Sequence, residues 1–220
     1  KEICLAAHLY DSWVHVDGAF GLWAQTSPQY AERLEGVEEA DSWATDGHKW
    51  LNVPYDSGYV FVRDEEAHRK SLSIDASYVI ESEGRDQFRW NPEWSRRARS
   101  FPTWAAIKVL GRQGIGEMVE RCCRISQDMV AKMGKLPGVE VVHQPTLNQG
   151  LVRFLGEDGL HDRRTDEVIL ELQHRGSVWF GGTTWNGMRV MRISVCNWQT
   201  SEKDVDAAID CLKKVLKLEL

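Results

Sequence analysis

Short apolar and polar blocks alternate along the first third of the chain. Residues 13–17 predict a buried strand that ends in a carboxylate, and residues 41–45 and 57–62 predict two more strands. The residues before position 10 have the pattern of a helix end, and residues 28–36 predict another helix. Strands that alternate with helices are typical of an α/β layer structure with a parallel or mixed sheet.

The middle of the chain has a different pattern. Residues 70–93 show neither a helical nor a strand period, and a stretch this long without regular structure is usually functional or mobile. Residues 95–112 have the apolar spacing of a buried helix. The glycines at positions 114 and 116 are expected to break this helix and to open a second long one, which ends near residue 135.

The final part of the chain returns to short alternating blocks. We expect strands at 139–142, 149–155, 178–183 and 189–196, and helices over 164–175 and from Ser201 onward. Ser201 and Asp204 have the spacing of a capping box, with Asp204 in the reciprocal position. We therefore place a domain boundary near residue 113, with a smaller α+β domain after it.

Composition narrows the classes of function. Hydrophobic residues make up 42% and charged residues 27% of the 220 residues, as in globular proteins. The formal net charge of -6, without a long basic run, argues against nucleic acid or a membrane surface as partner. No apolar stretch reaches the roughly 20 residues of a membrane span. The five cysteines lack Cys-x-x-Cys spacing, so we expect reduced thiols in a cytosolic protein and no metal site.

The first residue is Lys1 instead of methionine, and the residues that follow resemble the last turns of a helix that leads into a strand. A fold rarely begins in this way. We therefore expect the chain to be a fragment of a longer polypeptide.

Lys49 is the strongest candidate for chemistry. It lies in the turn Asp-Gly-His-Lys-Trp after a predicted strand, where a solvated lysine gains little, although most lysines in turns are surface residues. A lysine in such a turn can hold an aldehyde cofactor as a Schiff base. Asp17, 32 positions earlier, ends the first predicted strand and would keep a cofactor ring nitrogen protonated. Since ligands gather at the carboxyl ends of strands in α/β sheets, this pair predicts pyridoxal 5'-phosphate.

Two neighbouring residues have both a chemical and an ordinary interpretation. Ala19 would leave room for the face of the cofactor ring, or it is simply a small residue in a tight turn. His48 could reach a phosphate oxygen or the carboxylate of a substrate, or it could be a core histidine whose hydrogen bonds are satisfied locally.

These motifs resemble those of a known enzyme family. The segments His15-Val-Asp17-Gly-Ala19, Asp46-Gly-His48-Lys49-Trp and Arg192-Ile-Ser-Val-Cys are similar to the group II pyridoxal-phosphate-dependent amino-acid decarboxylases, which include the aromatic amino-acid and 2,4-diaminobutyrate decarboxylases. The resemblance covers essentially the whole chain. It implies the aspartate-aminotransferase fold (fold type I), with 1–112 as the C-terminal portion of the large cofactor-binding domain and 113–220 as the small C-terminal domain.

The resemblance also assigns roles. It places Lys49 as the Schiff-base lysine, Asp17 at the ring nitrogen, Ala19 against the ring and His48 in contact with the cofactor. The family's phosphate-binding segment and ring-stacking histidine would lie upstream of this chain.

Two further positions follow from the same resemblance. Asp46 stands where relatives often have Asn or Ser near the phosphate, so its charge would repel the phosphate unless an arginine compensates. Tyr78 stands where the aromatic amino-acid decarboxylases carry a loop tyrosine that reaches the partner subunit and returns a proton to the substrate carbon. A loop aromatic without a role is the alternative for Tyr78.

The expected function is a lyase that converts an L-amino acid to its amine and carbon dioxide in a cytoplasmic homodimer. Lys49, Tyr78 and His48 would be catalytic. Three alternatives stay open: an aldehyde synthase, an aminotransferase, or a non-catalytic fragment that associates with a companion chain. The roles of Arg192 and of a basic cluster are also open; the cluster consists of Arg96, Arg97 and Arg99.

Overall fold

The computed structural model describes residues 1–73 and 84–218. They form two compact units. The first consists of Lys1–Gln25 and Ala31–Arg112, and the second of Thr26–Tyr30 and Gln113–Leu220. Tyr78 lies outside the described residues. The assignment of the first unit to a large cofactor-binding domain stays a prediction.

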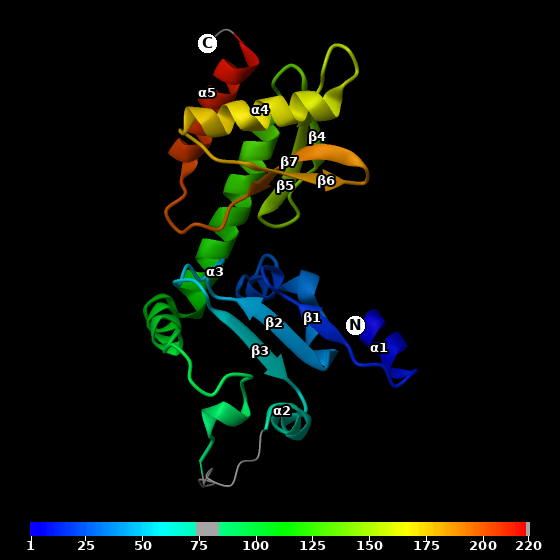
Figure 1. Ribbon diagram of the computed structural model, residues 1–220, viewed down its shortest axis with the longest axis vertical. Coiled ribbons are helices and arrows are strands. Elements are labelled where there is room, and N and C mark those ends of the chain that lie inside the picture. Colours follow the sequence, from blue (N-terminus) through cyan, green and yellow to red (C-terminus); the bar gives the residue numbers. More distant parts are fainter. Residues whose placement is uncertain (74–83, 219–220) are drawn as a thin grey trace. The chain divides into compact units, whose positions relative to one another are not determined.

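A three-stranded mixed sheet forms the centre of the first unit. Strand β1 (His15–Asp17) runs parallel to β2 (Ser42–Asp46), and β3 (Gly58–Val62) runs antiparallel to β2. The register places Asp17 opposite Ala44. Figure 1 shows the three strands side by side, in blue to cyan. The mixed sheet expected from the sequence is confirmed.

Side chains at the start of β2 fix the position of β1. The Asp41 carboxylate accepts the backbone N–H of Val14 at 2.7 Å and lies 3.1 Å from His8 Nε2. These two hydrogen bonds, the Val14 bond first, hold the pKa of Asp41 below its ordinary value. The next residue, Ser42, accepts the indole N–H of Trp13 at 2.8 Å. Side-chain contacts therefore hold the short strand in register where backbone pairing is limited.

The expectation that the first strand is buried is wrong. His15 and Asp17 are exposed and Val16 is only half-buried. The reason is tertiary: within the described residues, β1 pairs with β2 alone, so its other edge has no neighbouring strand. Asp17 is therefore a solvent-facing carboxylate and not the buried one that the apolar pattern suggested.

Helices and single turns surround this sheet. Helix α1 (Glu2–His8) precedes β1, and α2 (Glu65–Leu72), which the sequence pattern missed, follows β3. The Asp64 side chain caps α2 by accepting the N–H of Ala67. The remaining helical segments are short 3-10 helices: Gly21–Thr26, Ala31–Leu34, Val37–Glu39 and Gln87–Arg89. The helix expected over 28–36 is thus only a short 3-10 helix.

Helix α3 (Ser100–Met133) corrects two expectations. Its kink lies at Gly111, which has a φ of 62°, and not at the glycines further on. Gly116 instead allows close packing, because a Cβ there would lie 2.7 Å from the carbonyl oxygen of Thr26. The first half of the helix is not buried: the exposed fractions are 69% for Phe101 and 83% for Val109. Its apolar spacing marks a face that no described residue covers.

The second unit is an antiparallel sheet with helices packed on it. The strand order is β4-β5-β7-β6, with β4 Val139–His143, β5 Gln149–Phe154, β6 Gly181–Trp185 and β7 Met188–Ser194. Helix α4 (His161–Arg175) packs on β5 and β7, and α5 (Glu202–Leu216) packs on α4. Fully buried side chains form the core, among them Val130, Phe154 and Met191.

Helix α5 begins with the capping box that the sequence predicted. Asp204 Oδ2 accepts both the backbone N–H and the hydroxyl of Ser201, each at 2.8 Å. The hydroxyl and then the backbone N–H of Ser201 lower the pKa of Asp204. The prediction succeeds because every atom of a capping box lies within four consecutive residues.

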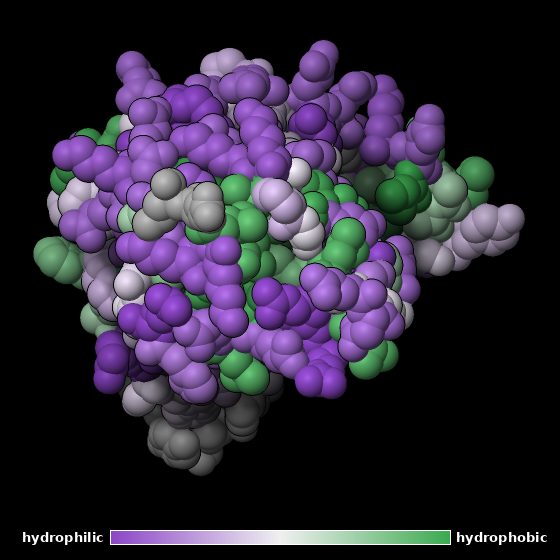
Figure 2. Space-filling model, turned by 90° about the horizontal axis from the view of Figure 1, so that it is seen from above, coloured by the Kyte–Doolittle hydropathy of each residue, from purple (hydrophilic) through white to green (hydrophobic). Residues whose placement is uncertain are grey.

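The surface and the thiols complete the description. The view from above in Figure 2 is mainly hydrophilic, with smaller hydrophobic areas between the polar residues. All five cysteines are free, and all but Cys196 are buried. No helix among the described residues has the length and apolar character needed to cross a membrane.

Candidate active site

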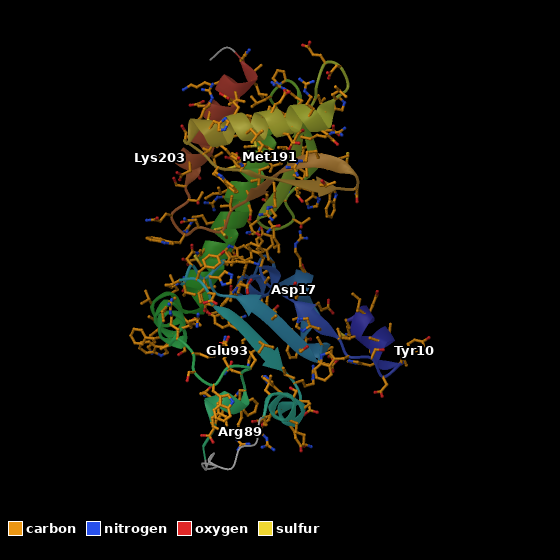
Figure 3. All side chains as sticks on the ribbon, viewed as in Figure 1. Tyr10, Asp17, Arg89, Glu93, Met191 and Lys203 are labelled. Atoms are coloured by element: carbon orange, nitrogen blue, oxygen red, sulfur yellow. The ribbon has the colours of Figure 1, made fainter. Side chains whose placement is uncertain are left out.

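The parallel pairing of β1 with β2 brings the loop after Asp17 to the end of β2. The N–H of Gly18 donates to the carbonyl of Ala44 at 2.8 Å, and the N–H of Asp46 donates to the carbonyl of Ala19 at 3.4 Å. Asp17 Oδ1 accepts the N–H of Ala19 at 3.2 Å, which fixes the carboxylate over its own turn. Figure 3 labels Asp17 at this end of β1. Asp17 and Ala19 therefore border the turn that carries Lys49.

Lys49 points toward this loop. Its Nζ lies 2.8 Å from Asp46 Oδ2 and 4.7 Å from the centre of the Phe20 ring. The side chain is 28% exposed, so it is accessible to a small molecule yet held on two sides. Phe20 follows Ala19 directly. The contact with its ring therefore places the amine beside the loop that follows Asp17.

His48 is held by the backbone of Ser57. His48 Nδ1 lies 3.0 Å from the backbone nitrogen of Ser57 and 2.9 Å from its carbonyl oxygen, so the backbone of this one residue fixes the position of the ring. His48 Nε2 lies 3.7 Å from Asp46 Oδ2. The Tyr55 ring stacks on the imidazole with 4.1 Å between ring centres, and Tyr55 itself is 73% exposed. His48 therefore presents Nε2, the ring nitrogen that Ser57 does not hold, toward Asp46.

Large aromatic side chains pack against the turn Asp46–Lys49 and fix its backbone. A Cβ at Gly47 would lie 2.0 Å from the hydroxyl oxygen of Tyr59, which also lies 2.6 Å from Thr103 Oγ1. The Trp23 indole donates to the carbonyl of Asp46 at 3.2 Å. Trp50, immediately after Lys49, is completely buried. These contacts fix the backbone that presents the amine.

Several of these contacts could not be inferred from the sequence. Phe20 beside Lys49, Tyr55 on His48 and Tyr59 beneath Gly47 all come from other loops or strands. No spacing rule joins them to the lysine motif. Only Phe20 had a usable signal, because it follows directly on the Asp-Gly-Ala segment.

The arginines of the basic cluster are not placed beside Asp46. Arg99 Nε donates to Asp56 at 2.6 Å, and Arg96 pairs with Glu93. The backbone N–H of Asp56 and then the Arg99 guanidinium hold the pKa of the Asp56 carboxyl below its ordinary value. Arg192 is an exposed residue of β7, in the second unit. Among the described contacts, the cation paired with Asp46 is Lys49 and not an arginine.

The side chains present fit an aldehyde cofactor with a ring nitrogen. They offer a primary amine at Lys49, an anchored carboxylate at Asp17 and the Nε2 atom of the His48 imidazole beside them. The described residues contain no cluster of three or more His, Cys, Asp or Glu side chains that could hold a metal ion.

Comparison with known proteins gives this arrangement a family. Residues 1–155 match the profile described as the pyridoxal-dependent decarboxylase conserved domain. The aromatic-L-amino-acid decarboxylase of Bacillus atrophaeus is 28% identical over 204 residues, covering 89% of this chain and 42% of that protein. The histidine decarboxylase of Drosophila melanogaster is 27% identical over 206 residues, covering 92% of this chain and 24% of that protein.

Solved structures share the fold. Oryza sativa TDC, crystallised with PLP and tryptamine, superimposes with a TM-score of 0.89 at 23% identity, covering 98% of this chain and 46% of that one. Rhodiola rosea 4-hydroxyphenylacetaldehyde synthase has a TM-score of 0.85 at 22% identity, covering 99% of this chain and 45% of that one. This chain thus spans less than half the length of these proteins. The expected aspartate-aminotransferase-like α/β fold is confirmed, and the chain belongs to the pyridoxal-dependent decarboxylase family.

Proposed function

We propose that this chain is part of a pyridoxal-phosphate-dependent lyase that converts an L-amino acid to its amine and carbon dioxide. The supporting observation is the amine of Lys49, which contacts Phe20 beside the loop that follows Asp17, at the adjoining ends of two parallel strands. Membership in the decarboxylase family supports the same reaction. When bound, the cofactor supplies an electron sink for the bond that breaks at the substrate carbon.

Each residue of the site has a defined task in this proposal. Lys49 provides the amine for covalent attachment and later takes part in product release. Asp17 has one oxygen anchored by the Ala19 N–H and directs its charge to a protonated ring nitrogen. His48 would contact the phosphate or the substrate carboxylate through its imidazole, and Ala19 would leave space beside the ring.

The proton that replaces the lost carboxylate needs a donor, and we assign this role to Tyr78. A phenol, whose ordinary pKa is about 10, can donate its proton once water is excluded from the site. The assignment rests on the position of Tyr78 in the sequence, because the residue lies outside the described part of the chain.

A second candidate reaction is aldehyde formation. The 3,4-dihydroxyphenylacetaldehyde synthase of Aedes aegypti is 26% identical over 213 residues. An aminotransferase would use the same lysine and carboxylate and would yield a keto acid. The product therefore separates the three reactions: an amine, an aldehyde or a keto acid.

We also propose a cytoplasmic homodimer with an L-amino acid as substrate. The free thiols support a reducing compartment. Support for association comes from the exposed apolar side chains of the first unit, including Val60 and Phe61 on strand β3, which are 52% and 53% exposed. An exposed apolar edge strand is normally covered by another segment. Such a cover is a second copy or the remainder of the family fold on the same or a companion chain.

The function is tested by trapping and by product analysis. The protein is incubated with pyridoxal phosphate, reduced with borohydride and mapped by mass spectrometry, and in parallel it is given a panel of amino acids. We expect reduction to label Lys49, and we expect amines as products. The Lys49→Ala variant should lose both, whereas Lys108→Ala, in the exposed part of α3, should keep both.

Two results would overturn the assignment. Labelling that persists in Lys49→Ala shows that another residue holds the cofactor. Wild-type protein that gains no visible absorbance with the cofactor supports the non-catalytic fragment instead.

A further inference from the structure

The Asp46 carboxylate occupies an unusual place for a residue expected near a phosphate. Its Oδ2 is within 2.8 Å of Lys49 Nζ and 3.7 Å of His48 Nε2. The first neighbour is an ammonium group and the second is a ring nitrogen of an imidazole. Asp46 is therefore directed at the reactive amine and not at an anion.

We propose that Asp46 is the positioning residue of Lys49 and the acceptor of its proton. In the cofactor-free protein the carboxylate holds the ammonium beside Phe20, and it takes up the proton that the ammonium must lose before it attacks an aldehyde. This role rests on the function proposed above, since it concerns the same lysine.

The backbone of Asp46 is suited to such a role because it is fixed on several sides. Asp46 is the last residue of β2 and is paired with Gly58 across the antiparallel ladder. Its N–H donates to Ala19 and its carbonyl accepts the indole N–H of Trp23. A carboxylate on a fixed strand end can orient a lysine three residues later. Without this ion pair, the lysine side chain would populate several rotamers.

The chemistry of condensation defines what Asp46 must do. Nζ forms a bond to the aldehyde carbon, the carbon–oxygen double bond of the aldehyde is lost, and water leaves. Two of the three ammonium protons leave with that water, and the third is released. Asp46 Oδ2, at 2.8 Å, accepts this third proton and passes it to solvent, which reaches its 26% exposed side chain.

His48 is the second neighbour of the Asp46 carboxylate. Its Nδ1 contacts the backbone of Ser57, and its Nε2 lies 3.7 Å from Asp46 Oδ2. When Lys49 is no longer an ammonium, this imidazole and the solvent at the 26% exposed side chain of Asp46 limit the cost of an unpaired charge. The ion pair with Lys49 also explains how a carboxylate is tolerated where a phosphate is expected.

The test compares two aldehydes, pyridoxal and pyridoxal phosphate, on the full 220-residue chain. The rate of borohydride-trapped labelling of Lys49 is followed by mass spectrometry from about pH 6 to pH 10, the range in which amines lose protons. The variants are Asp46→Asn, Asp46→Glu and a matched control, Asp64→Asn. Asp64 caps α2 in the same unit, and asparagine caps a helix equally well. Thermal melting shows whether each variant is folded.

We expect Asp46→Asn to label Lys49 at least about tenfold more slowly at pH 7 with either aldehyde, and to recover at high pH. Asp46→Glu should recover part of the rate, and Asp64→Asn should match wild type. An Asp46→Asn rate that is unchanged with pyridoxal, or higher only with pyridoxal phosphate, overturns the positioning role and leaves the proposed function intact. Absence of Lys49 labelling in the wild type overturns both.

Discussion

The hydroxyl of Tyr59 occupies the space into which a side chain at Gly47 would project. A Cβ at Gly47 would lie 2.0 Å from that oxygen and 2.6 Å from the ring carbon that bears it. The glycine of the lysine turn is therefore required by close packing against β3. This contact joins the turn that presents Lys49 to a strand residue ten or more positions away in the sequence.

Replacing Gly47 should therefore disturb the site as well as the fold. We expect Gly47→Ala to lower the free energy of unfolding by about 1–3 kcal/mol, the usual cost of overpacking, and to slow the labelling of Lys49. Chemical denaturation and borohydride trapping measure the two effects. Gly21→Ala is the control, because a Cβ there meets no atom within 4 Å. Equal stability of the two variants would show that Tyr59 moves aside freely.

Asp17 should be needed for turnover but not for attachment of the cofactor to Lys49. Its carboxylate is anchored by Ala19 and does not hold the Lys49 amine, whose ion pair is with Asp46. We expect Asp17→Asn to retain labelling of Lys49 by pyridoxal phosphate but to lower kcat at least about 100-fold, because the ring nitrogen loses its anionic partner. Asp11→Asn, in the exposed turn before β1, is the control. Unchanged kcat would remove Asp17 from the site.

Tyr78 should determine the fate of the substrate carbon. We expect Tyr78→Phe to keep the cofactor bound and, in air-saturated buffer, to divert product from amine toward aldehyde, because a carbon that is not protonated stays open to oxidation by dissolved dioxygen. Mass spectrometry of the products gives the ratio of the two. Tyr10→Phe is a suitable control, since Tyr10 is 84% exposed beside α1 and is labelled in Figure 3. The same amine yield in both variants would make Tyr78 a bystander.

The capping box of α5 should make stability depend on pH. Ser201 lowers the pKa of Asp204 below its ordinary 3.8, so the ionised carboxylate stabilises the folded state. This contribution is complete above about pH 5, declines as the pH falls below 3.8, and is lost once the pH passes the folded-state pKa. Urea midpoints at pH 7 and pH 3 measure it.

The matching variant is Asp204→Asn. It should lower the urea midpoint at pH 7, and its difference from wild type should shrink at pH 3. The control is Asp210→Asn on the same helix, where the ion pair with Lys213 is 3.8 Å long. A difference that stays constant with pH would show that the charge of Asp204 does not contribute.

The sequence was informative where a run of consecutive residues has a recognisable pattern. Alternating patterns identified the main strands, and the Ser201–Asp204 box predicted the start of the last helix. The lysine turn and the upstream Asp-Gly-Ala segment were enough to indicate the family, which the comparisons confirm. Their chemical roles remain predictions.

Burial and side-chain partners were decided by tertiary structure. The apolar patterns of β1 and of the first half of α3 suggested buried elements, yet Asp17 and Phe101 are exposed. Apolar spacing shows which face of an element can be buried, but burial itself needs a segment to cover that face. In the same way, the pairing of Asp46 with Lys49 was missed. The sequence showed two nearby charged residues, and only the folded turn shows that one is directed at the other.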